Sequence, residues 1–441
     1  MTLRKIIAAL LLVCSVSAAA LERQSNDDYR ARRQKLGALA KGGAVLLFAS
    51  TEASAGDAIS GFRQNNNFYY LTGNPEPGGA VLVVGAREAA DDKPAREYSE
   101  VLFLPARNMV QEKWTGPKLG PDSPEARQVT GFDRVASLET LPRVLAELGP
   151  TRIYADVPRW NGTSPDAQGI EGLARLNAIS GQVADAKPLL AQLRMVKDAG
   201  ELALIRKATD ASVAAHLAAM HAMKPGINER EISALMQYEF LRRGCERSAY
   251  APIVGSGFYS TVLHYSADDK TVADGDVAVL DVGGEYGMYA TDITRTLPAN
   301  GRFTDRQREI YNIVLGAQQA AIHAFVAGKS MLRGDGPDSL NKVARDYINT
   351  HGKDLHGEPL GKYFIHGLGH FVGLEVHDPG ENVPLTAGMV FTLEPGIYIP
   401  EEKLGVRIED TFMVAADGSL VSLSAKLPRT AEDVEREMKK R

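Results

Sequence analysis

Residues 277–284 read Val277-Ala278-Val279-Leu280-Asp281-Val282-Gly283-Gly284, an apolar strand pattern that an aspartate interrupts near its end. A second segment, Tyr289-Ala290-Thr291-Asp292-Ile293-Thr294, carries Asp292 eleven residues after Asp281. The glycines between the two segments suit a hairpin turn. We therefore expect two antiparallel strands that bring both carboxylates together.

Two more acids interrupt apolar strand patterns nearer the C-terminus. Glu394 ends the segment 389–394, and Glu409 lies within the segment 406–410. Burying an ionised carboxylate among apolar side chains is costly unless the carboxylate is paired or binds a cation. One acid of this kind is explained by a strand end that reaches water. Four such acids on neighbouring strands instead indicate a cation site.

A cluster of histidines lies between these acids. His366, His370 and His377 are three of the nine histidines and fall within 12 residues. His366 and His370 are four residues apart, but Gly367 stands where the helical zinc-protease motif has glutamate. The glycines of this segment disfavour a regular helix. We expect a loop or strand that presents the imidazoles to a functional site, whereas a single histidine here would be structural.

The charge of this residue set predicts the ion. Four carboxylates would be balanced by two divalent cations. An oxygen-rich set with one imidazole suits manganese, cobalt or zinc better than an ion that prefers thiolates. Two such ions, about 3.5–4 Å apart, would hold a bridging hydroxide and polarise a carbonyl group. The pattern therefore predicts a hydrolase.

The chain of 441 residues divides into two regions with different patterns. Residues 28–187 alternate short apolar runs, at 44–48, 80–84 and 101–104, with helical spacing such as 138–148. We expect an α/β domain here. It lacks a glycine-rich phosphate loop and a cluster of acids and histidines, so we expect it to shape access to a site elsewhere.

Residues 190–430 show long helical patterns and separate β-rich stretches. Helices are predicted for 198–223, from Asn228, for 304–328 and from Asp338, with capping boxes at Asn228 and Thr304. The stretches 277–282, 288–296, 389–394 and 406–414 are predicted strands. This order predicts an α+β domain with helices on a largely antiparallel sheet.

The first 20 residues have the pattern of a cleaved signal peptide. Arg4 and Lys5 precede an apolar stretch, 6–16, and small residues end at Ala20. A membrane-spanning helix would need about 20 apolar residues. Cys14 leaves lipid attachment as an alternative, although Val13 stands where a lipoprotein signal has a small residue. We expect export to the periplasm or the medium, and no membrane span.

The rest of the composition excludes some partners. The 50 basic and 55 acidic residues give a net charge of -5, so no excess positive charge attracts nucleic acid or an anionic membrane. Removing residues 1–20 leaves Cys245 as the sole cysteine, which cannot form an internal disulfide. Export without disulfides fits a bacterial periplasm.

The chain resembles aminopeptidase P and prolidase, the proline-specific branch of the pita-bread metallopeptidases. Segment 366–378 is similar to the histidine signature of that branch. Four further segments look like its other ligand segments and follow in the family's order: Leu280 to Gly283, Thr291 to Thr296, Thr392 to Gly396, and Arg407 to Asp410. Residues 62–73 are similar to the leading domain of aminopeptidase P. The resemblance covers nearly everything after residue 20.

The resemblance implies a pita-bread catalytic domain with two divalent ions, usually manganese. The implied ligands are Asp281, Asp292, His370, Glu394 and Glu409. Asp292 and Glu409 would bridge the ions, Asp281 would hold one ion, and His370 and Glu394 would hold the other. Glu394 is also a candidate for taking the proton of the attacking hydroxide.

Other residues match positions beside the substrate in the family. His264 and His377 would stabilise the tetrahedral intermediate and assist departure of the proline nitrogen, and His366 would line the same pocket. Tyr398 and Arg407 match positions near the metals. The family also implies a homo-oligomer, either a dimer or a tetramer.

The implied activity is release of the N-terminal residue from peptides with proline in second position, by a metal-bridging hydroxide that attacks the Xaa-Pro carbonyl. The Xaa-Pro bond is a tertiary amide without an N–H group, which peptidases that bind extended strands handle poorly. Prolidase, which cuts only Xaa-Pro dipeptides, is the alternative. The short stretch between His377 and Glu394 and the N-terminal similarity favour the aminopeptidase.

Two further alternatives are weaker. A methionine aminopeptidase shares the catalytic fold and ligand types, but it normally lacks such a leading domain. A binding protein of this fold, or a metal-free creatinase-like enzyme, would have lost ligands, and the sequence lacks none.

Overall fold

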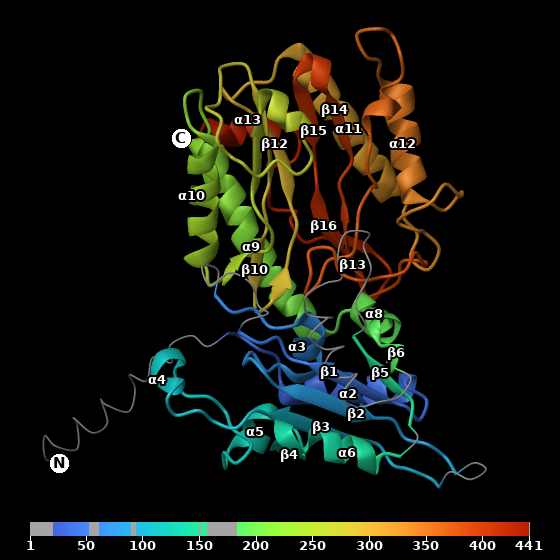
Figure 1. Cartoon of the computed structure of the whole chain (residues 1–441). Helices are drawn as coiled ribbons and strands as arrows, with labels where there is room; N and C mark the ends of the chain where they lie inside the picture. Colours follow the sequence, from blue (N-terminus) through green and yellow to red (C-terminus); the bar gives the residue numbers. More distant parts are fainter. Residues whose placement is uncertain (1–20, 53–60, 90–93, 150, 157–182, 441) are drawn as a thin grey trace, which may run out of the picture.

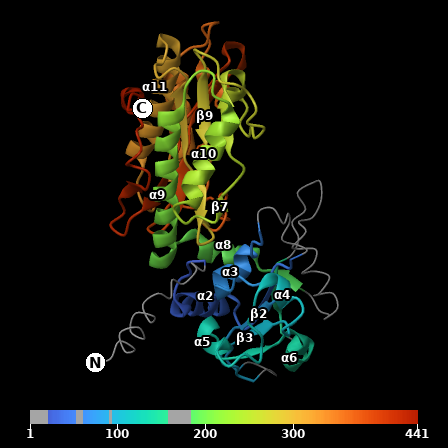
Figure 2. The ribbon, with the colours of Figure 1, turned by 90° about the vertical axis from the view of Figure 1, so that its left-hand side faces the viewer.

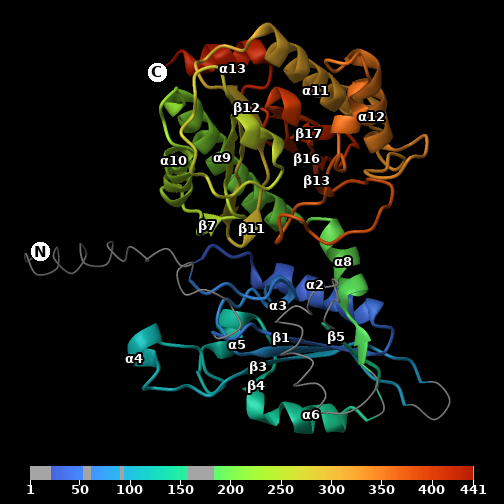
Figure 3. The ribbon, with the colours of Figure 1, turned by 45° about the horizontal axis from the view of Figure 1, so that its top comes forward.

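The computed structural model describes residues 21–52, 61–89, 94–149, 151–156 and 183–440. Helix α8 (Lys187–Met195) joins an N-terminal domain, formed by the residues before it, to a C-terminal domain, formed by those after it (Figures 1 and 3). The predicted signal peptide, 1–20, lies outside the described residues. None of the helices in the described part is long and apolar enough to cross a membrane.

The N-terminal domain is built on a six-stranded mixed sheet with the strand order β4-β3-β2-β1-β5-β6. Pairs β1–β2 and β2–β3 are antiparallel, whereas β3–β4, β1–β5 and β5–β6 are parallel. The strands are β1 (Ala44–Phe48), β2 (Ala80–Val84), β3 (Ser99–Leu104), β4 (Val135–Ser137), β5 (Ile153–Ala155) and β6 (Val183–Asp185). The expected strands at 44–48 and 80–84 have these bounds.

Helices cover both faces of this sheet. The helices that the structure describes in this domain are α2 (Asn26–Leu39), α3 (Asn66–Thr72), α4 (Glu112–Thr115), α5 (Ala126–Thr130) and α6 (Leu141–Glu147), of which α4 buries no residue. Val45 and Leu47 of β1 lie in one apolar cluster with residues of α2 and α3, and Leu46 lies in another with residues of α6. A central strand buried on both faces reads as an unbroken apolar run, which explains the sequence pattern.

Four of the five α-helices described in the C-terminal domain begin within two residues of the predicted starts, and the last, at residues 431–438, is not predicted. The five are α9 (Ala199–Ala222), α10 (Glu229–Leu241), α11 (Asp305–Ala324), α12 (Leu340–His351) and α13 (Ala431–Met438). Capping boxes begin α10 at Asn228 and α11 at Thr304, as expected. The fourth predicted helix is α12, which Ser339 caps. Helix α11 ends at Ala324, about one turn before the predicted end at residue 328.

Its strands are short, and their pairings are antiparallel. They form the sheets β12-β9-β8, β11-β10-β7, β13-β16-β17 and β14-β15. The strands are β7 (Arg247–Ser248), β8 (Ile253–Ser256), β9 (Val277–Asp281), β10 (Gly284–Tyr286), β11 (Tyr289–Ala290), β12 (Thr294–Pro298), β13 (Val390–Leu393), β14 (Gly396–Ile399), β15 (Leu404–Arg407), β16 (Asp410–Val414) and β17 (Leu420–Ser422). Helices α9 and α10 pack on this β-structure (Figure 2).

Two predicted strands are each broken into two. Stretch 288–296 consists of β11 and β12, with Asp292 in the gap, and stretch 406–414 consists of β15 and β16, with Glu409 in the gap. Strands β9 and β12 pair as predicted, but β10 and β11 lie between them and turn at Gly287, whose φ is +58°. The regular strand pattern therefore stops where a carboxylate leaves the sheet.

Candidate metal centre and active site

A cavity of about 800 Å³ lies at the meeting of the two domains. Asp185 and Lys187, at the end of β6 and the start of α8, line it together with residues of the C-terminal domain. Eight of the ten residues that the sequence predicts for the site also line it: His264, Asp281, Asp292, His366, His370, His377, Glu394 and Arg407. The other two, Tyr398 and Glu409, are buried.

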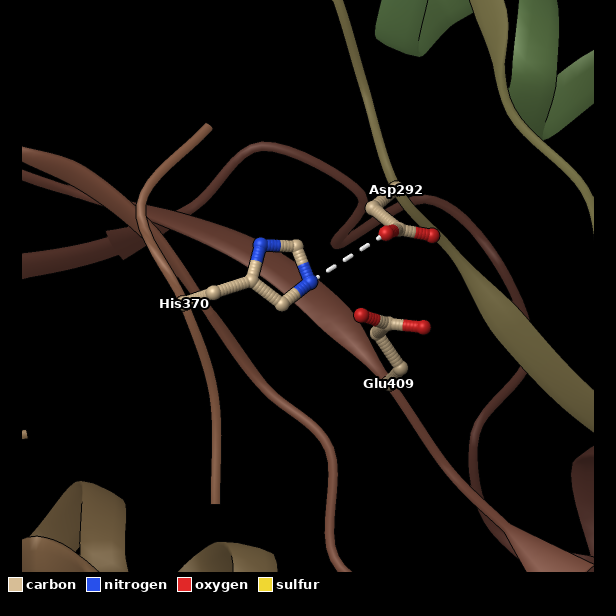
Figure 4. Close-up of side chains that lie close together, drawn as sticks. All are labelled: Asp292, His370 and Glu409. Atoms are coloured by element: carbon tan, nitrogen blue, oxygen red, sulfur yellow. Dashed lines mark ion pairs between the residues drawn. The ribbon is translucent and has the colours of Figure 1, made fainter. Parts of the chain in front are cut away.

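The side chains of Asp292, His370 and Glu409 converge in this region (Figure 4). One possible ligand atom from each residue lies within 4.8 Å of the others. His370 Nε2 lies 3.4 Å from Asp292 Oδ2 and 3.3 Å from Glu394 Oε1. Four of the five predicted metal ligands are therefore neighbours around one imidazole.

The fifth predicted ligand, Asp281, reaches this group through a tyrosine. The Tyr250 hydroxyl lies 2.7 Å from Asp281 Oδ1 and also within hydrogen-bond distance of Asp292 Oδ1, so the two carboxylates share its one proton donor. Arg407 Nη2 donates to Asp281 Oδ2 at 2.6 Å. Burial opposes ionisation of Asp281, but the charge of Arg407 holds its pKa below the usual value. Sequence reasoning missed Tyr250, since no pattern of acids or histidines surrounds it.

A buried histidine supports the two aspartate segments from behind. His216 of α9 places its Nε2 3.1 Å from the carbonyl oxygens of Val282 and Ile293, the residues that follow Asp281 and Asp292. Burial lowers the pKa of His216 to about 4, so the ring is neutral and donates one proton to these carbonyls. The helix thus completes the hydrogen bonding where the strands stop.

The carboxylates carry more negative charge than their neighbours balance. Glu409 Oε2 accepts a hydrogen bond from Thr294 at 2.7 Å, whereas Oε1 is buried without a partner in the described part of the chain. Burial, followed by the charge of Asp292, raises the pKa of Glu409 well above its ordinary value. Burial also raises the pKa of Glu394 to about 7. Buried carboxylates with an unpaired oxygen fit divalent cations, and the single imidazole fits a first-row transition metal.

A hydrogen-bonded line connects the cavity wall to Asp281. His366 Nε2 lies 2.8 Å from the Tyr398 hydroxyl, and Arg407 Nη1 donates to that hydroxyl at 2.9 Å. Burial lowers the pKa of His366 to about 4, so its ring is neutral. Because the hydroxyl accepts from Arg407, its own proton is directed to His366. Tyr398 and Arg407 thus position neighbouring groups rather than standing free in the cavity.

The two other predicted histidines lie on the open side of the cavity. The ring of His377 is 4.1 Å from that of His370, centroid to centroid. Burial, followed by the charge of His370, lowers the pKa of His377 to about 4. His264 is exposed and lines the same cavity. Both imidazoles are therefore accessible to a ligand that approaches the metal ligands.

A buried ion-pair network ties His377 to the N-terminal domain. Asp378 accepts hydrogen bonds from Arg194 at 2.7 Å and from Lys197 at 2.9 Å. Arg194, on α8, also donates to Asn67 Oδ1 of α3 at 2.7 Å. A Cβ at position 373 would come within 2.5 Å of Asp378 Oδ2, so Gly373 makes room for this carboxylate. The sequence signal was an acid inside the histidine segment, but its partners lie about 180 residues away.

Known proteins match the chain over nearly its whole length. The family model "Aminopeptidase P, N-terminal domain" matches residues 29–154, and "Metallopeptidase family M24" matches residues 203–416. The Xaa-Pro aminopeptidase of Haemophilus influenzae is 31% identical over 95% of this chain and 98% of its own length. That of Escherichia coli is 32% identical over 93% and 97%, respectively.

Solved structures agree with this match. Proline aminopeptidase P II from Yersinia pestis superposes with a TM-score of 0.79 at 28% identity, over 95% of this chain and all of the other. Aminopeptidase P from E. coli, with the inhibitor Pro-Leu, gives a TM-score of 0.78 at 29% identity over 95% and 99%. The predicted fold, an α/β domain followed by a pita-bread domain, is confirmed. The chain belongs to the Xaa-Pro aminopeptidase family of M24 metallopeptidases.

Proposed function

We propose that this metallopeptidase releases the N-terminal residue from peptides with proline in second position. The observation that carries the proposal is the group of buried acids around His370, at the wall of a cavity that three further histidines also line. The similarity to proteins named Xaa-Pro aminopeptidase indicates which bond is cleaved. Residues of the N-terminal domain line the cavity as well, which favours binding of a chain end over the middle of a long strand.

Five residues would hold the two ions: Asp281, Asp292, His370, Glu394 and Glu409. When bound, divalent ions lower the pKa of a water molecule and polarise a carbonyl group. Thr392 Oγ1 donates to Glu394 Oε1 at 3.1 Å, which fixes the carboxylate that takes the proton of the attacking water. Tyr250 and Arg407 each donate one hydrogen bond to Asp281, which holds it in place, and the charge of Arg407 favours its ionised form.

His264 and His377 complete the reaction on the open side of the cavity. In this proposal their imidazoles stabilise the negative charge that develops on the carbonyl oxygen and assist departure of the proline nitrogen. That nitrogen must be protonated to leave, because an amide anion is too basic a leaving group, and the proton released by the attacking water balances this step. His366, held by Tyr398, lines the wall that faces the substrate.

A peptide panel tests this function. Purified protein is assayed with an Xaa-Pro dipeptide, an Xaa-Pro-Xaa tripeptide and an Xaa-Ala-Xaa tripeptide, before and after treatment with a chelator. We expect cleavage of the proline tripeptide alone, lost with chelator and restored by metal. Activity confined to the dipeptide would favour prolidase, and cleavage of the alanine peptide would contradict proline specificity.

We propose manganese as the native metal, with cobalt and zinc as alternatives. The support is the mixture of carboxylate oxygens and one imidazole, which suits all three ions. Elemental analysis of protein purified without added metal identifies the ion. Reconstitution of chelated protein with each ion in turn then ranks them by the activity restored.

Export, domain limits and assembly complete the proposal. Residues 1–20 would direct export to the periplasm or medium and then be removed, so the mature protein would begin at Leu21, which N-terminal sequencing tests. Limited proteolysis tests the limits 28–187 and 190–430. The family resemblance supports a dimer or tetramer, which light scattering distinguishes from a monomer.

A further inference from the structure

Arg333 lines the cavity but has no part in the machinery described above. It lies in the connection between α11 and α12, next to Leu332, whose side chain is buried. Its backbone N–H donates to Asn382 Oδ1 at 3.2 Å, and Asn382 Nδ2 donates back to its carbonyl at 3.3 Å. A backbone bridge between Met331 and Ser339 closes the loop. The backbone that carries this arginine is therefore anchored on several sides.

The guanidinium group of Arg333 differs from the other arginines of the cavity and its wall. Arg407 and Arg194 each donate to a buried carboxylate. Among the described residues, no hydrogen-bond acceptor or carboxylate pairs with the Arg333 side chain, although Glu381 and Asp185 line the same cavity. Arg333 therefore presents a positive charge and five N–H donors to whatever enters.

Arg333 and His370 line one cavity, so a peptide bound at His370 would share that cavity with the charge of Arg333. His377, whose ring contacts that of His370, lines the same cavity as Arg333. Two residues beyond the cleaved bond span about 7 Å in extended form. In a tripeptide, the group at the end of that span is the terminal carboxylate.

Resting on the proposed function, we propose that Arg333 binds the C-terminal carboxylate of short peptides and makes the enzyme select Xaa-Pro-Xaa substrates with a free C-terminus. A planar guanidinium can bind a carboxylate through two parallel hydrogen bonds, which a single amide at the same place cannot match. Arg333 is thus a specificity residue that acts on substrate binding, while the chemistry stays with the residues around His370.

The test compares one tripeptide as free acid and as C-terminal amide. We expect wild-type protein to cleave the acid with kcat/KM about fivefold to tenfold above that of the amide, a difference that lies mainly in KM. Arg333→Gln should remove this preference and leave kcat and the amide kinetics unchanged. Arg333→Lys should keep part of it, because lysine retains the charge without the paired donors.

A matched arginine serves as the control. Arg345 is exposed on α12, close in sequence but absent from the cavity lining, so Arg345→Gln should keep the wild-type acid-to-amide ratio. Equal kcat/KM values for acid and amide in wild type, or equal losses for both in Arg333→Gln, would overturn the inference.

A binding measurement separates this inference from the proposed activity. The dipeptides Pro-Xaa and Pro-Xaa-amide, which represent the released product, are titrated calorimetrically into wild type and Arg333→Gln. Tighter binding of the acid in wild type alone would support the role of Arg333 even if the protein failed to cut proline peptides. Equal affinities for the two dipeptides in wild type would contradict it, whatever the peptide panel shows.

Discussion

The central strand of the N-terminal domain and the strand that carries Asp281 are both buried, but only one of them holds a charge. Strand β1 has apolar residues on both faces, covered by α2 and α3 on one side and by α6 on the other. Strand β9 is buried throughout and ends in Asp281, which pairs with Arg407 and Tyr250. The first strand serves packing alone, whereas the second gives up an apolar contact to place a carboxylate.

The surroundings explain why the fold tolerates this charge. Around Asp281, Asp292, Glu394 and Glu409, the chain supplies one imidazole, one guanidinium and hydroxyl groups, and Glu409 keeps an unpaired oxygen. Strand β1 lies instead between two apolar clusters. These four acids, which outnumber the positive groups around them, are therefore expected to be stable only when cations complete the site.

Removal of His370 should have the largest effect on function. His370→Ala deletes the imidazole that contacts both Asp292 and Glu394, so we expect kcat/KM to fall by about 1,000-fold or more with the metal content reduced. Circular dichroism should show an intact fold. Turnover near that of wild type would mean that the acids around His370 are not the catalytic centre.

Placing a carboxylate in the N-terminal sheet should instead reduce the stability of the fold. Leu46 is fully buried on the face of β1 that α6 covers, so Leu46→Asp buries a charge without a partner. We expect a loss of about 4 kcal/mol or more in the free energy of unfolding. Chemical denaturation measures it, with Leu46→Ala as the control for lost apolar volume. A stable Leu46→Asp protein would undermine the contrast between the two strands.

Loss of the Asp378 ion pairs, which link the two domains, should have an intermediate effect on stability. Asp378→Asn leaves the buried Lys197 without its ionised partner and leaves Arg194 with Glu375 alone, which should cost about 3 kcal/mol of stability. Activity should fall as well, because Asp378 adjoins His377. The exposed pair Lys342–Asp346 is the control, and Lys342→Met should change stability by less than about 0.5 kcal/mol. Equal losses of stability in Asp378→Asn and Lys342→Met would show that the buried network does not stabilise the fold.

Loss of one hydroxyl should weaken the site without unfolding it. Tyr250→Phe removes the donor that joins Asp281 to Asp292, and we expect metal affinity or kcat/KM to drop about 10- to 100-fold. Tyr311→Phe is a matched control, because its hydroxyl donates to Arg429 O, away from the metal ligands. Unchanged metal affinity and activity in Tyr250→Phe would show that this bridge is dispensable.

The smallest effect concerns the pH dependence of the Asp378 network. The charges of Arg194 and Lys197 overcome burial and hold the pKa of Asp378 below its ordinary value. Its contribution to stability is therefore full above the unfolded pKa of about 4 and declines as the pH falls toward the lower folded pKa. The stability gap between wild type and Asp378→Asn should narrow below that pH, in denaturation curves measured from pH 6 to 3. A stability difference between wild type and Asp378→Asn that widens as the pH falls would contradict a lowered pKa for Asp378.

The sequence predicts the parts of the molecule that depend on local pattern. The capped starts of α10 and α11 and the strands at 44–48 and 80–84 follow from adjacent residues. It does not show that the strands break at Asp292 and Glu409, since both acids lie inside otherwise strand-like stretches. Where the strands stop, groups that are distant in the sequence, such as His216, supply the hydrogen bonds that a neighbouring strand would otherwise make.

The missed site residues share one property. Tyr250 and Arg194 each act through contacts made by folding, and no spacing in the sequence marks them. The acids and histidines were found because charge in an apolar run is itself a signal. A tyrosine or an arginine in an ordinary surface-like segment carries no such signal.

The central claim is that the acids of the C-terminal domain are stable there because two divalent cations bind among them. The most direct test is elemental analysis of the dialysed wild-type protein beside His370→Ala and Leu46→Ala. The account predicts about two divalent ions per chain in wild type and Leu46→Ala, and clearly fewer in His370→Ala. Wild-type protein without bound divalent metal, whose activity persists in chelator, would contradict it.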